Sequence, residues 1–188
     1  MRVIAGKAKG RALEAPKGMN TRPITAMMKE ALFSMWQFQM RDASFLDLFA
    51  GSGSMGIEAI SRGAEKAVFV ELDRNAVEVI KRNVKTCKFE QQAVVYKDDV
   101  FSRLKWLQAN KQFFDIIYLD PPFTQDTIFH PVIEAVADAN ILNPDGVIAI
   151  RTLKEKEMPD AVGNLVKYKH KVYGISAIHF YCLEEEAE

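Results

Sequence analysis

Short apolar segments and segments with helical spacing alternate along most of this 188-residue chain. Apolar runs of this length predict strands, which we place at residues 45–49, 67–71, 93–96, 114–119 and 146–150. Between them, apolar residues recur every three or four positions, which predicts helices at residues 54–62, 75–87, 100–108 and 127–140. Such an alternation is typical of a parallel sheet with helices on both faces.

The start of the chain departs from this alternation. Short alternating pieces around two glycines predict a small β-hairpin rather than a core element. Thr25 is a candidate N-cap, and the apolar spacing that follows it predicts a helix to about Met40. We therefore expect a basic N-terminal hairpin arm at residues 1–24 and one domain at residues 25–188.

The last two apolar segments differ again. Residues 166–173 and 175–182 alternate apolar and polar side chains on either side of Gly174. This pattern predicts an antiparallel pair at the edge of the sheet. We therefore expect an α/β fold with a mostly parallel, seven-stranded sheet, an antiparallel end and helices on both faces.

Composition supports a globular domain of this kind. Hydrophobic residues make up 48% of the chain, too many for a disordered protein. No apolar run is long enough to span a bilayer, and the N-terminus has no apolar segment of signal-peptide type. Cys87 and Cys182 lack the spacing of a metal site or a disulfide framework. We expect a cytoplasmic protein without a metal ion; the oligomeric state stays open, with a monomer favoured.

The formal net charge is zero, but the charges are distributed unevenly. The first 41 residues carry eight basic side chains and two acidic ones, so the rest of the chain is acidic by the same amount. A basic arm on an acidic body is typical of a segment that binds phosphate groups. A solvated surface hairpin explains the charge equally well. The candidate nucleic-acid contacts in the arm are Lys7, Lys9, Arg11 and Arg22.

A glycine-rich turn follows the first predicted strand. Gly51, Gly53 and Gly56 lie between this strand and a helix, where glycines let the backbone turn sharply and approach a cofactor. Glu71 ends the next strand, where a carboxylate can accept hydrogen bonds from both ribose hydroxyls of an adenosine. The same pattern fits a nicotinamide dinucleotide, and a βα turn without a ligand is the plain structural alternative.

Three further acidic residues are candidates for a cofactor site. Asp47 precedes the loop inside its strand, where a carboxylate can orient the loop or meet a cationic ligand. Asp98 and Asp99 follow the third strand, directly before Val100, where an acid can accept a hydrogen bond from an adenine amino group. Asp99 is also a candidate helix N-cap. Each of these acids can instead be a cap or a solvated charge.

The fourth predicted strand ends in the motif Asp120-Pro121-Pro122-Phe123, at the edge where open α/β sheets bind ligands. The lone pair of a nucleobase amine is delocalised into the ring, and two acceptors that hold its hydrogens let the nitrogen aim this pair at a methyl group. Asp120 can supply one acceptor and a proline-fixed carbonyl the other. Phe123 offers a face for base stacking. Hydride transfer has no use for this set, so the motif favours methylation of a nucleobase amine.

In order and spacing, these motifs resemble those of class I S-adenosylmethionine-dependent methyltransferases. The matching positions are residues 46–53, Glu71, Asp98 and Asp120-Pro121-Pro122-Phe123. Residues 2–6, Arg22-Pro23 and residues 29–33 extend the resemblance over nearly the full length, to the RsmD family. That family methylates guanine N2 in bacterial small-subunit (16S) ribosomal RNA. The resemblance implies a Rossmann-like methyltransferase fold, S-adenosylmethionine as cofactor, and ribosomal RNA or a partly assembled small subunit as partner.

The resemblance also implies a role for each site residue. The cofactor's methionine part would lie at Gly51 and Gly53, its ammonium at Asp47, its ribose at Glu71, and its adenine at Asp98, Asp99 and the Val100 backbone. The target base would be held by Asp120, Pro121, Pro122 and Phe123. Three positions depart from the family pattern, because Ile24 replaces the usual Thr and Ala26-Met27 replaces a common Asp-Arg pair. These departures put the family's RNA contacts at this segment in question.

Three other functions stand as alternatives. The same two acceptors suit the N6 amine of adenine in DNA or RNA, so the motif alone does not choose guanine. A catalytically inactive nucleic-acid-binding module would keep the fold, although the complete glycine loop, Glu71 and Asp120 argue against it. An NAD-dependent oxidoreductase would share the loop but has no need of the Asp-Pro-Pro-Phe motif. We predict direct methyl transfer to guanine N2, without a metal ion or a covalent intermediate.

Overall fold

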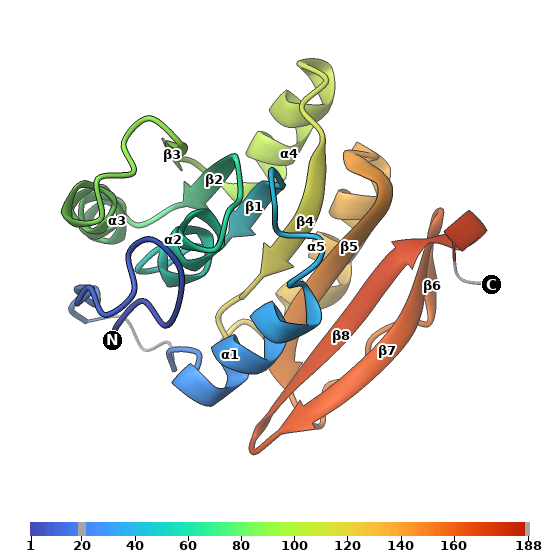
Figure 1. Ribbon diagram of the computed structural model, residues 1–188. Coiled ribbons are helices and arrows are strands. Elements are labelled where there is room, and N and C mark those ends of the chain that lie inside the picture. The colour runs from blue at the N-terminus through green and yellow to red at the C-terminus, as the bar shows by residue number, and fades with distance from the viewer. Residues whose placement is uncertain (19–21, 187–188) are drawn as a thin grey trace.

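The computed structural model describes residues 1–18 and 22–186, which contain one eight-stranded sheet. Its order is β3-β2-β1-β4-β5-β8-β7-β6, parallel from β3 to β5 and antiparallel from β5 to β6 (Figure 1). The strands are β1 (Ser44–Leu48), β2 (Lys66–Glu71), β3 (Ala93–Lys97), β4 (Phe114–Leu119), β5 (Leu142–Leu153), β6 (Ala161–Val162), β7 (Leu165–Tyr173) and β8 (Ser176–Leu183). The expected α/β fold is confirmed. The eighth strand, β6, was not predicted because two residues are too few to produce a pattern.

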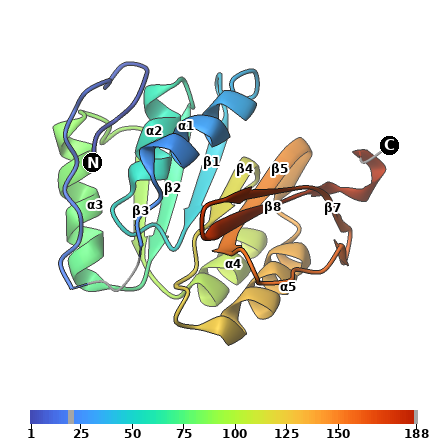
Figure 2. The same cartoon turned by 90° about the horizontal axis from the view of Figure 1, so that it is seen from below.

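Helices cover both faces of the sheet (Figure 2). One face carries α1 (Ala26–Met35), α2 (Ser54–Ser61) and α3 (Arg74–Thr86); the other carries α4 (Val100–Ala109) and α5 (Phe129–Ala139). Short 3-10 turns, η1 (Asp126–Ile128) and η2 (Glu184–Glu186), precede α5 and follow β8. Among the described helices, none is both long and apolar enough to cross a membrane.

The two faces of the sheet bury separate hydrophobic clusters. In β1, Phe45 packs into the cluster with α1 and α2, whereas Leu46 and Leu48 pack into the cluster with α4 and α5. Successive side chains of a strand point to opposite faces, so strands that are apolar throughout are explained by burial on both faces. Asp47 breaks this pattern, because it is a carboxylate with only 1% of its surface exposed.

Side-chain caps begin several helices at the expected places. The Thr25 hydroxyl accepts the Met28 N–H at 3.2 Å, and the Asp99 carboxylate accepts the Ser102 N–H at 3.0 Å. Such bonds satisfy N–H groups that have no partner inside the first turn. Both predicted N-caps are confirmed.

Two elements differ in length from the prediction. α1 ends at Met35 rather than near Met40, because the chain turns at residues 36–39. Trp36 is buried although it lies beyond the end of the helix, so its apolar side chain gave the sequence the spacing of a longer helix. β5 begins at Leu142, ahead of polar residues that interrupt the apolar pattern, and it continues far enough to include Arg151.

The first residues of the chain form an arm that packs along α2. An isolated antiparallel bridge joins Arg2 to Ala12, and this bridge is the extent of strand pairing within residues 1–18. Ser61, at the end of α2, accepts the Lys7 N–H on its carbonyl oxygen at 2.8 Å and the Ala8 N–H on its hydroxyl at 2.9 Å. Backbone hydrogen bonds therefore fasten the arm to the helix.

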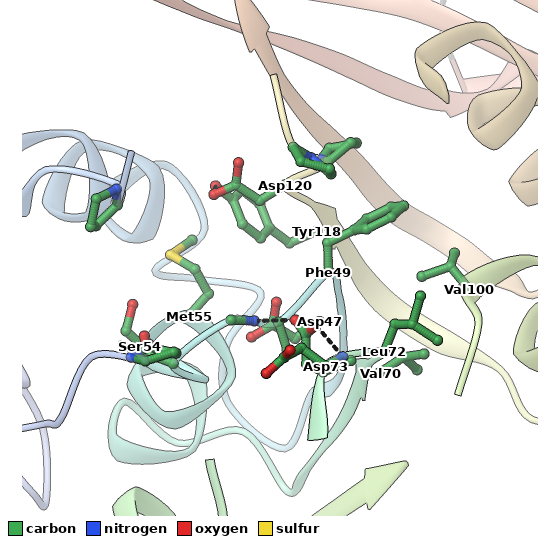
Figure 3. Close-up of a pocket in the computed structure, with 18 of the residues that line it drawn as sticks. Asp47, Phe49, Ser54, Met55, Val70, Leu72, Asp73, Val100, Tyr118 and Asp120 are labelled. Atoms are coloured by element: carbon green, nitrogen blue, oxygen red, sulfur yellow. Dashed lines mark hydrogen bonds between the residues drawn. The ribbon is translucent and has the colours of Figure 1, made fainter. Parts of the chain in front are cut away.

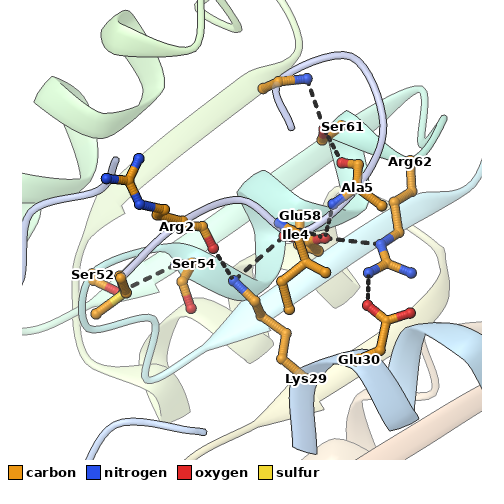
Figure 4. A network of polar contacts seen from close by, with 12 residues as sticks. Arg2, Ile4, Ala5, Lys29, Glu30, Ser52, Ser54, Glu58, Ser61 and Arg62 are labelled. Carbon is orange, nitrogen blue, oxygen red and sulfur yellow. Dashed lines mark hydrogen bonds and ion pairs between the residues drawn. The ribbon is translucent and has the colours of Figure 1, made fainter. Parts of the chain in front are cut away.

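A buried carboxylate provides the second attachment of the arm (Figure 4). Glu58, in the middle of α2, accepts the Ile4 and Ala5 N–H groups at 3.0–3.2 Å. It also pairs with Lys29 of α1 at 3.4 Å and with Arg62 at 2.9 Å. A buried carboxylate is stable only with such partners. Glu58 thus joins the arm, α1 and α2 at one point.

Candidate active site

A cavity of about 940 Å³ opens at the carboxyl ends of the parallel strands. Open α/β sheets bind ligands at this edge, and the volume suits a small-molecule site. Residues that follow β1, β2, β3 and β4 line it, together with parts of the arm (Figure 3). The lining includes the predicted site residues Asp47, Gly51, Glu71, Asp99, Val100, Asp120, Pro121, Pro122, Phe123 and Arg22. One cavity therefore brings together residues predicted for the cofactor and for the base.

The three glycines of the loop have different tasks. Gly51 has a φ of 58°, lines the cavity, and a Cβ placed on it would meet no atom within 4 Å. Gly53, with a φ of 79°, packs over Ile80 and Phe69 and is not part of the lining. A Cβ on Gly56 would lie 2.3 Å from the Phe69 ring. Gly51 leaves room for a ligand, whereas Gly53 and Gly56 permit the sharp turn and the close packing of α2 on the sheet.

Asp47 lies directly before the loop and is buried at the cavity wall. Its Oδ2 accepts the Gly56 N–H at 3.1 Å, which ties β1 to the first turn of α2. Burial raises the pKa of Asp47 well above its usual value, and the carboxylates of Asp120 and Glu71 raise it further. A cation beside Asp47 would offset this cost, which fits the predicted position of an ammonium group.

Glu71 ends β2 and orients two neighbouring turns. One oxygen, Oε2, accepts the Gly51 N–H at 2.8 Å, and the other, Oε1, accepts the Asp73 N–H at 3.0 Å. The side chain is 7% exposed and lines the cavity. Backbone donors on both oxygens hold the carboxylate in one orientation, and its remaining lone pairs can accept from ribose hydroxyls.

The acidic pair after β3 is divided between two environments. Asp98 accepts from Arg103 Nε at 3.0 Å and from the Asp99 N–H at 2.8 Å, and it is not among the residues that line the cavity. The Arg103 guanidinium in turn covers the Tyr96 ring at 3.9 Å. Asp99 and Val100 both line the cavity. The adenine contact of Asp98 stays a prediction, whereas Asp99 and Val100 are at the cavity itself.

Asp120 is held on one side by two donors. Its Oδ2 accepts from Arg151 Nη1 at 3.0 Å and from Tyr118 Oη at 3.3 Å, whereas Oδ1 lies 3.4 Å from the same arginine nitrogen. The Asp120 N–H donates to the Leu48 carbonyl of β1 at 3.2 Å. Burial raises the pKa of Asp120, and the Arg151 guanidinium opposes that rise. Oδ1 is therefore the carboxylate oxygen with the weaker internal contact.

The rest of the motif adds a second acceptor and an aromatic ring. The Pro122 carbonyl accepts the Gln125 N–H at 3.1 Å, but no described residue donates to the Pro121 carbonyl. Phe123 lines the cavity, and the Arg151 guanidinium lies 5.0 Å from its ring centre. Asp120 Oδ1 and the Pro121 carbonyl thus belong to residues that line the cavity, and both have capacity to accept from a ligand.

Sequence reasoning missed three residues that organise the site. Arg151 is 2% exposed at the end of β5, and the available signal was a single cation directly after an apolar strand. Tyr118 lies in β4, two residues before Asp120, and its hydroxyl donates to Asp120 Oδ2. Asn83 of α3 donates to the Glu14 carbonyl at 3.0 Å and to the Ser52 carbonyl at 2.9 Å, which joins the arm to the glycine loop. A polar residue within a helix gave no sign of such distant partners.

The basic residues of the arm are not all at the cavity. Arg22 lines it, whereas Lys7, Lys9 and Arg11 are exposed near the turn of the arm, at the opposite end of α2 from the glycine loop. Lys29 belongs to the same basic stretch of sequence, but it is 4% exposed and paired with a carboxylate. The surface charge of this region is therefore lower than the sequence suggests.

The arrangement fits S-adenosylmethionine at several points. Asp47 offers a buried carboxylate to an ammonium group, Glu71 offers oriented acceptors to ribose hydroxyls, and Gly51 leaves space beside the backbone. Within the described ranges, no group of three or more His, Cys, Asp or Glu residues is arranged to hold a metal ion. These carboxylates are suited to bind a nucleoside that carries a positive charge.

Known proteins match this chain from the arm to the last strand. The model of the family described as conserved hypothetical protein 95 matches residues 1–182. The "Putative rRNA methyltransferase YlbH" of Bacillus subtilis is 38% identical over 181 residues, covering 96% of this chain and 98% of that protein. The ribosomal RNA small subunit methyltransferase D of Haemophilus influenzae is 35% identical over 184 residues, covering 96% and 93%.

A solved structure agrees with these matches. The structure titled "Putative methyltransferase yhhF from Escherichia coli" superposes with a TM-score of 0.83 at 30% identity and covers 98% of both chains. The shared length includes the arm as well as the sheet and its cavity. Because the family model, the sequences and the fold agree over nearly the whole length, this chain belongs to the RsmD family, described as conserved hypothetical protein 95.

Proposed function

We propose that this protein transfers a methyl group from S-adenosylmethionine to the exocyclic N2 amine of a guanine in small-subunit (16S) ribosomal RNA. Relatives from Haemophilus influenzae and Escherichia coli, 35% and 30% identical, carry the name ribosomal RNA small subunit methyltransferase D. The observation that carries the proposal is the pair of acceptors, Asp120 Oδ1 and the Pro121 carbonyl, in the same cavity as the cofactor residues.

The acceptor pair explains how a weak nucleophile can react. An amine bound at this wall would donate one hydrogen to Asp120 Oδ1 and the other to the Pro121 carbonyl. With both hydrogens held, the nitrogen lone pair turns out of the ring system and points into the cavity. The nitrogen loses one hydrogen as a proton after it gains the methyl group, and Asp120 Oδ1 would accept it. Phe123 would stack on the base.

The opposite wall would bind the cofactor. When bound, S-adenosylmethionine supplies a methyl group that is electrophilic because it is attached to a positively charged sulfur. Asp47 would pair with the ammonium group, Glu71 would accept from the ribose hydroxyls, and Asp99 and Val100 would border the adenine. The chain's contribution is orientation and exclusion of water.

The arm would guide RNA toward the cavity. Lys7, Lys9 and Arg11 are exposed along the arm, and Arg22 lies at the cavity itself. Basic side chains along the path of the RNA attract its phosphate backbone but do not select its sequence. The target base must leave its stack to enter the cavity. We propose that a monomer acts in the cytoplasm on ribosomal RNA, either free or in a partly assembled small subunit.

The nucleoside that gains the methyl group tests this proposal. Small ribosomal subunits and naked 16S RNA from a bacterial strain that lacks the enzyme would be incubated with tritiated S-adenosylmethionine, digested and separated. We expect label in N2-methylguanosine, and only a small amount of it with Asp120→Ala. Label only in N6-methyladenosine would overturn the guanine assignment. No label, together with no calorimetric binding of S-adenosylhomocysteine, would instead indicate an inactive nucleic-acid-binding module.

A further inference from the structure

Arg151 is a neighbour of Asp120 because β4 and β5 run in parallel. Leu119 pairs with Ile150 across these strands, so the next residue of each strand lies at the same height of the sheet. Arg151 is 2% exposed. A guanidinium buried to this degree is costly unless its N–H groups are bonded. Its bonds therefore indicate what it does.

The Arg151 guanidinium contacts several parts of the site. Nη1 donates to Asp120 Oδ2 at 3.0 Å and to the Arg22 carbonyl at 2.8 Å. Nε donates to the Ser176 hydroxyl at 3.4 Å, and Cζ lies 5.0 Å from the centre of the Phe123 ring. One buried cation thus holds the catalytic carboxylate, the aromatic ring of the motif and the segment before α1.

We propose that Arg151 is a positioning residue that reserves Oδ1 of Asp120 for the target amine. This inference rests on the proposed function. Oδ2 already has two donors, Arg151 Nη1 and Tyr118 Oη. A carboxylate held at one oxygen cannot exchange its two oxygens by rotation, so the other oxygen presents its lone pairs in a constant direction. The planar, always-charged guanidinium suits this task better than a flexible ammonium group.

Arg151 also favours the charged form of Asp120, which burial disfavours. Burial raises the pKa of Asp120, whereas Arg151 of β5 and Tyr118 of β4 lower it. Asp47 of β1 and, beyond it, Glu71 of β2 face the same cavity with negative charge. Without the Arg151 charge, Asp120 would therefore stay protonated to higher pH, and a protonated carboxyl is a weaker acceptor for an amine.

Substitutions of Arg151 test this role in two independent ways. In the ligand-free protein, the Asp120 carboxyl would be titrated by ¹³C NMR, with Asp120→Asn for assignment. We expect a higher midpoint in Arg151→Gln than in the wild type, and an intermediate one in Arg151→Lys. In methyl transfer, Arg151→Gln should lower kcat by about tenfold to a hundredfold. The acidic limb of the pH profile of Arg151→Gln should move to higher pH. In Arg151→Lys, this limb should lie closer to that of the wild type.

The affinities and two further variants separate positioning from a merely structural role. The affinity for S-adenosylhomocysteine should change by less than about twofold in Arg151→Gln, and the KM for RNA should change less than kcat does. Tyr118→Phe removes the other donor to Oδ2 and should also raise the Asp120 midpoint; Lys105→Gln, on the exposed face of α4, should not. Midpoints equal to that of the wild type in Arg151→Gln and Tyr118→Phe would overturn the inference. If the midpoints move but a different nucleoside is methylated, the proposed function fails and the positioning role stands.

Discussion

At the scale of single residues, three of the carboxylates that line the cavity are each held by different donors. Asp47 accepts from one backbone N–H, Glu71 accepts from two, and Asp120 accepts from Arg151 and Tyr118. Burying acids close together is unfavourable in the free protein, as the raised pKa values of Asp47 and Asp120 indicate. A cofactor whose ammonium group lies beside Asp47 would offset part of that cost, so the electrostatic cost in the free protein favours binding.

Asp47→Asn should separate stability from binding. The folded protein raises the pKa of Asp47, so protonated Asp47 stabilises the fold relative to ionised Asp47. This stabilisation is complete below the unfolded pKa and is lost as pH rises through the folded pKa. Asn cannot ionise, so the variant should melt about 2–4 °C above the wild type at pH 8, for a gain on the order of 1 kcal/mol. Melting curves at several pH values measure this difference, which should shrink toward pH 4.

The same substitution should weaken the cofactor site. Calorimetry should give at least about tenfold lower affinity for S-adenosylhomocysteine, because a charged hydrogen bond to the ammonium group is lost. Asn can still accept the Gly56 N–H, so the loop should keep its shape. A variant that melts below the wild type at every pH would contradict the assigned electrostatics.

Asp120→Ala should remove the chemistry and spare the cofactor. Loss of an acceptor that acts in the transition state should lower kcat by about 10²–10³, with cofactor affinity within about twofold of the wild type. The variant also leaves the buried Arg151 without its carboxylate, so Asp120→Asn is the better-matched control for folding. Single-turnover kinetics and calorimetry provide the two measurements. Equal losses in both would mean that Asp120 binds the cofactor rather than the base.

At the scale of elements, α2 connects the cofactor loop to the arm. Its first turn follows the glycine loop, Glu58 in its middle binds the arm and Lys29, and Ser61 at its end binds the arm again. An eight-residue helix has little stability of its own, so tertiary contacts must hold it in place. Loop geometry and arm attachment therefore depend on the same short helix.

Glu58→Gln should destabilise this connection strongly. Removing one partner of a buried ion pair costs about 3–5 kcal/mol, because Lys29 would stay buried without a counter-charge. The double variant Lys29→Met/Glu58→Gln should recover part of that loss, since it buries no unpaired charge. Glu30→Gln, at the exposed partner of Arg62, should have little effect. Urea unfolding measures all three, and a double variant no more stable than Glu58→Gln would argue against the pair.

At the scale of the whole molecule, the cavity and the exposed basic residues of the arm lie toward opposite ends of α2. The cavity is at the carboxyl edge of the sheet, whereas Lys7, Lys9 and Arg11 lie toward the opposite end of the helix. RNA that contacts both would have to run along the arm. A zero net charge is then compatible with RNA binding, because the field near the arm matters more than the total.

The salt dependence of RNA binding tests the arm as a phosphate-binding segment. If Lys9 and Arg11 each contact a phosphate, Lys9→Gln and Arg11→Gln should each reduce the slope of log K against log salt by about 1. Lys105→Gln, on the opposite face of the sheet, should leave the slope unchanged. Filter binding to a 16S RNA fragment at several salt concentrations measures the slopes. Unchanged slopes in both arm variants would indicate that the arm is a solvated surface segment that does not bind phosphate groups.

The sequence by itself determined the order of strands and helices along the chain, and most of the site residues that it predicted line the cavity. An apolar run such as residues 114–119 requires burial on both faces of a sheet. This requirement depends on the run alone, so it predicts a strand without knowledge of the rest of the fold. The glycine loop, Glu71 and Asp120 were predictable because each follows a strand, and the carboxyl ends of parallel strands meet at one edge. These properties depend on neighbours in the chain.

Only the tertiary structure decided which residues face each other across elements. Arg151 reaches Asp120 through the register of β4 and β5, and Lys29 loses its exposure because Glu58 lies opposite it on another helix. Asp98 pairs with Arg103 and does not line the cavity, although the resemblance predicts that it contacts the cofactor. Pairing between side chains depends on distances through space, and a buried charge takes whichever partner the packing brings within reach.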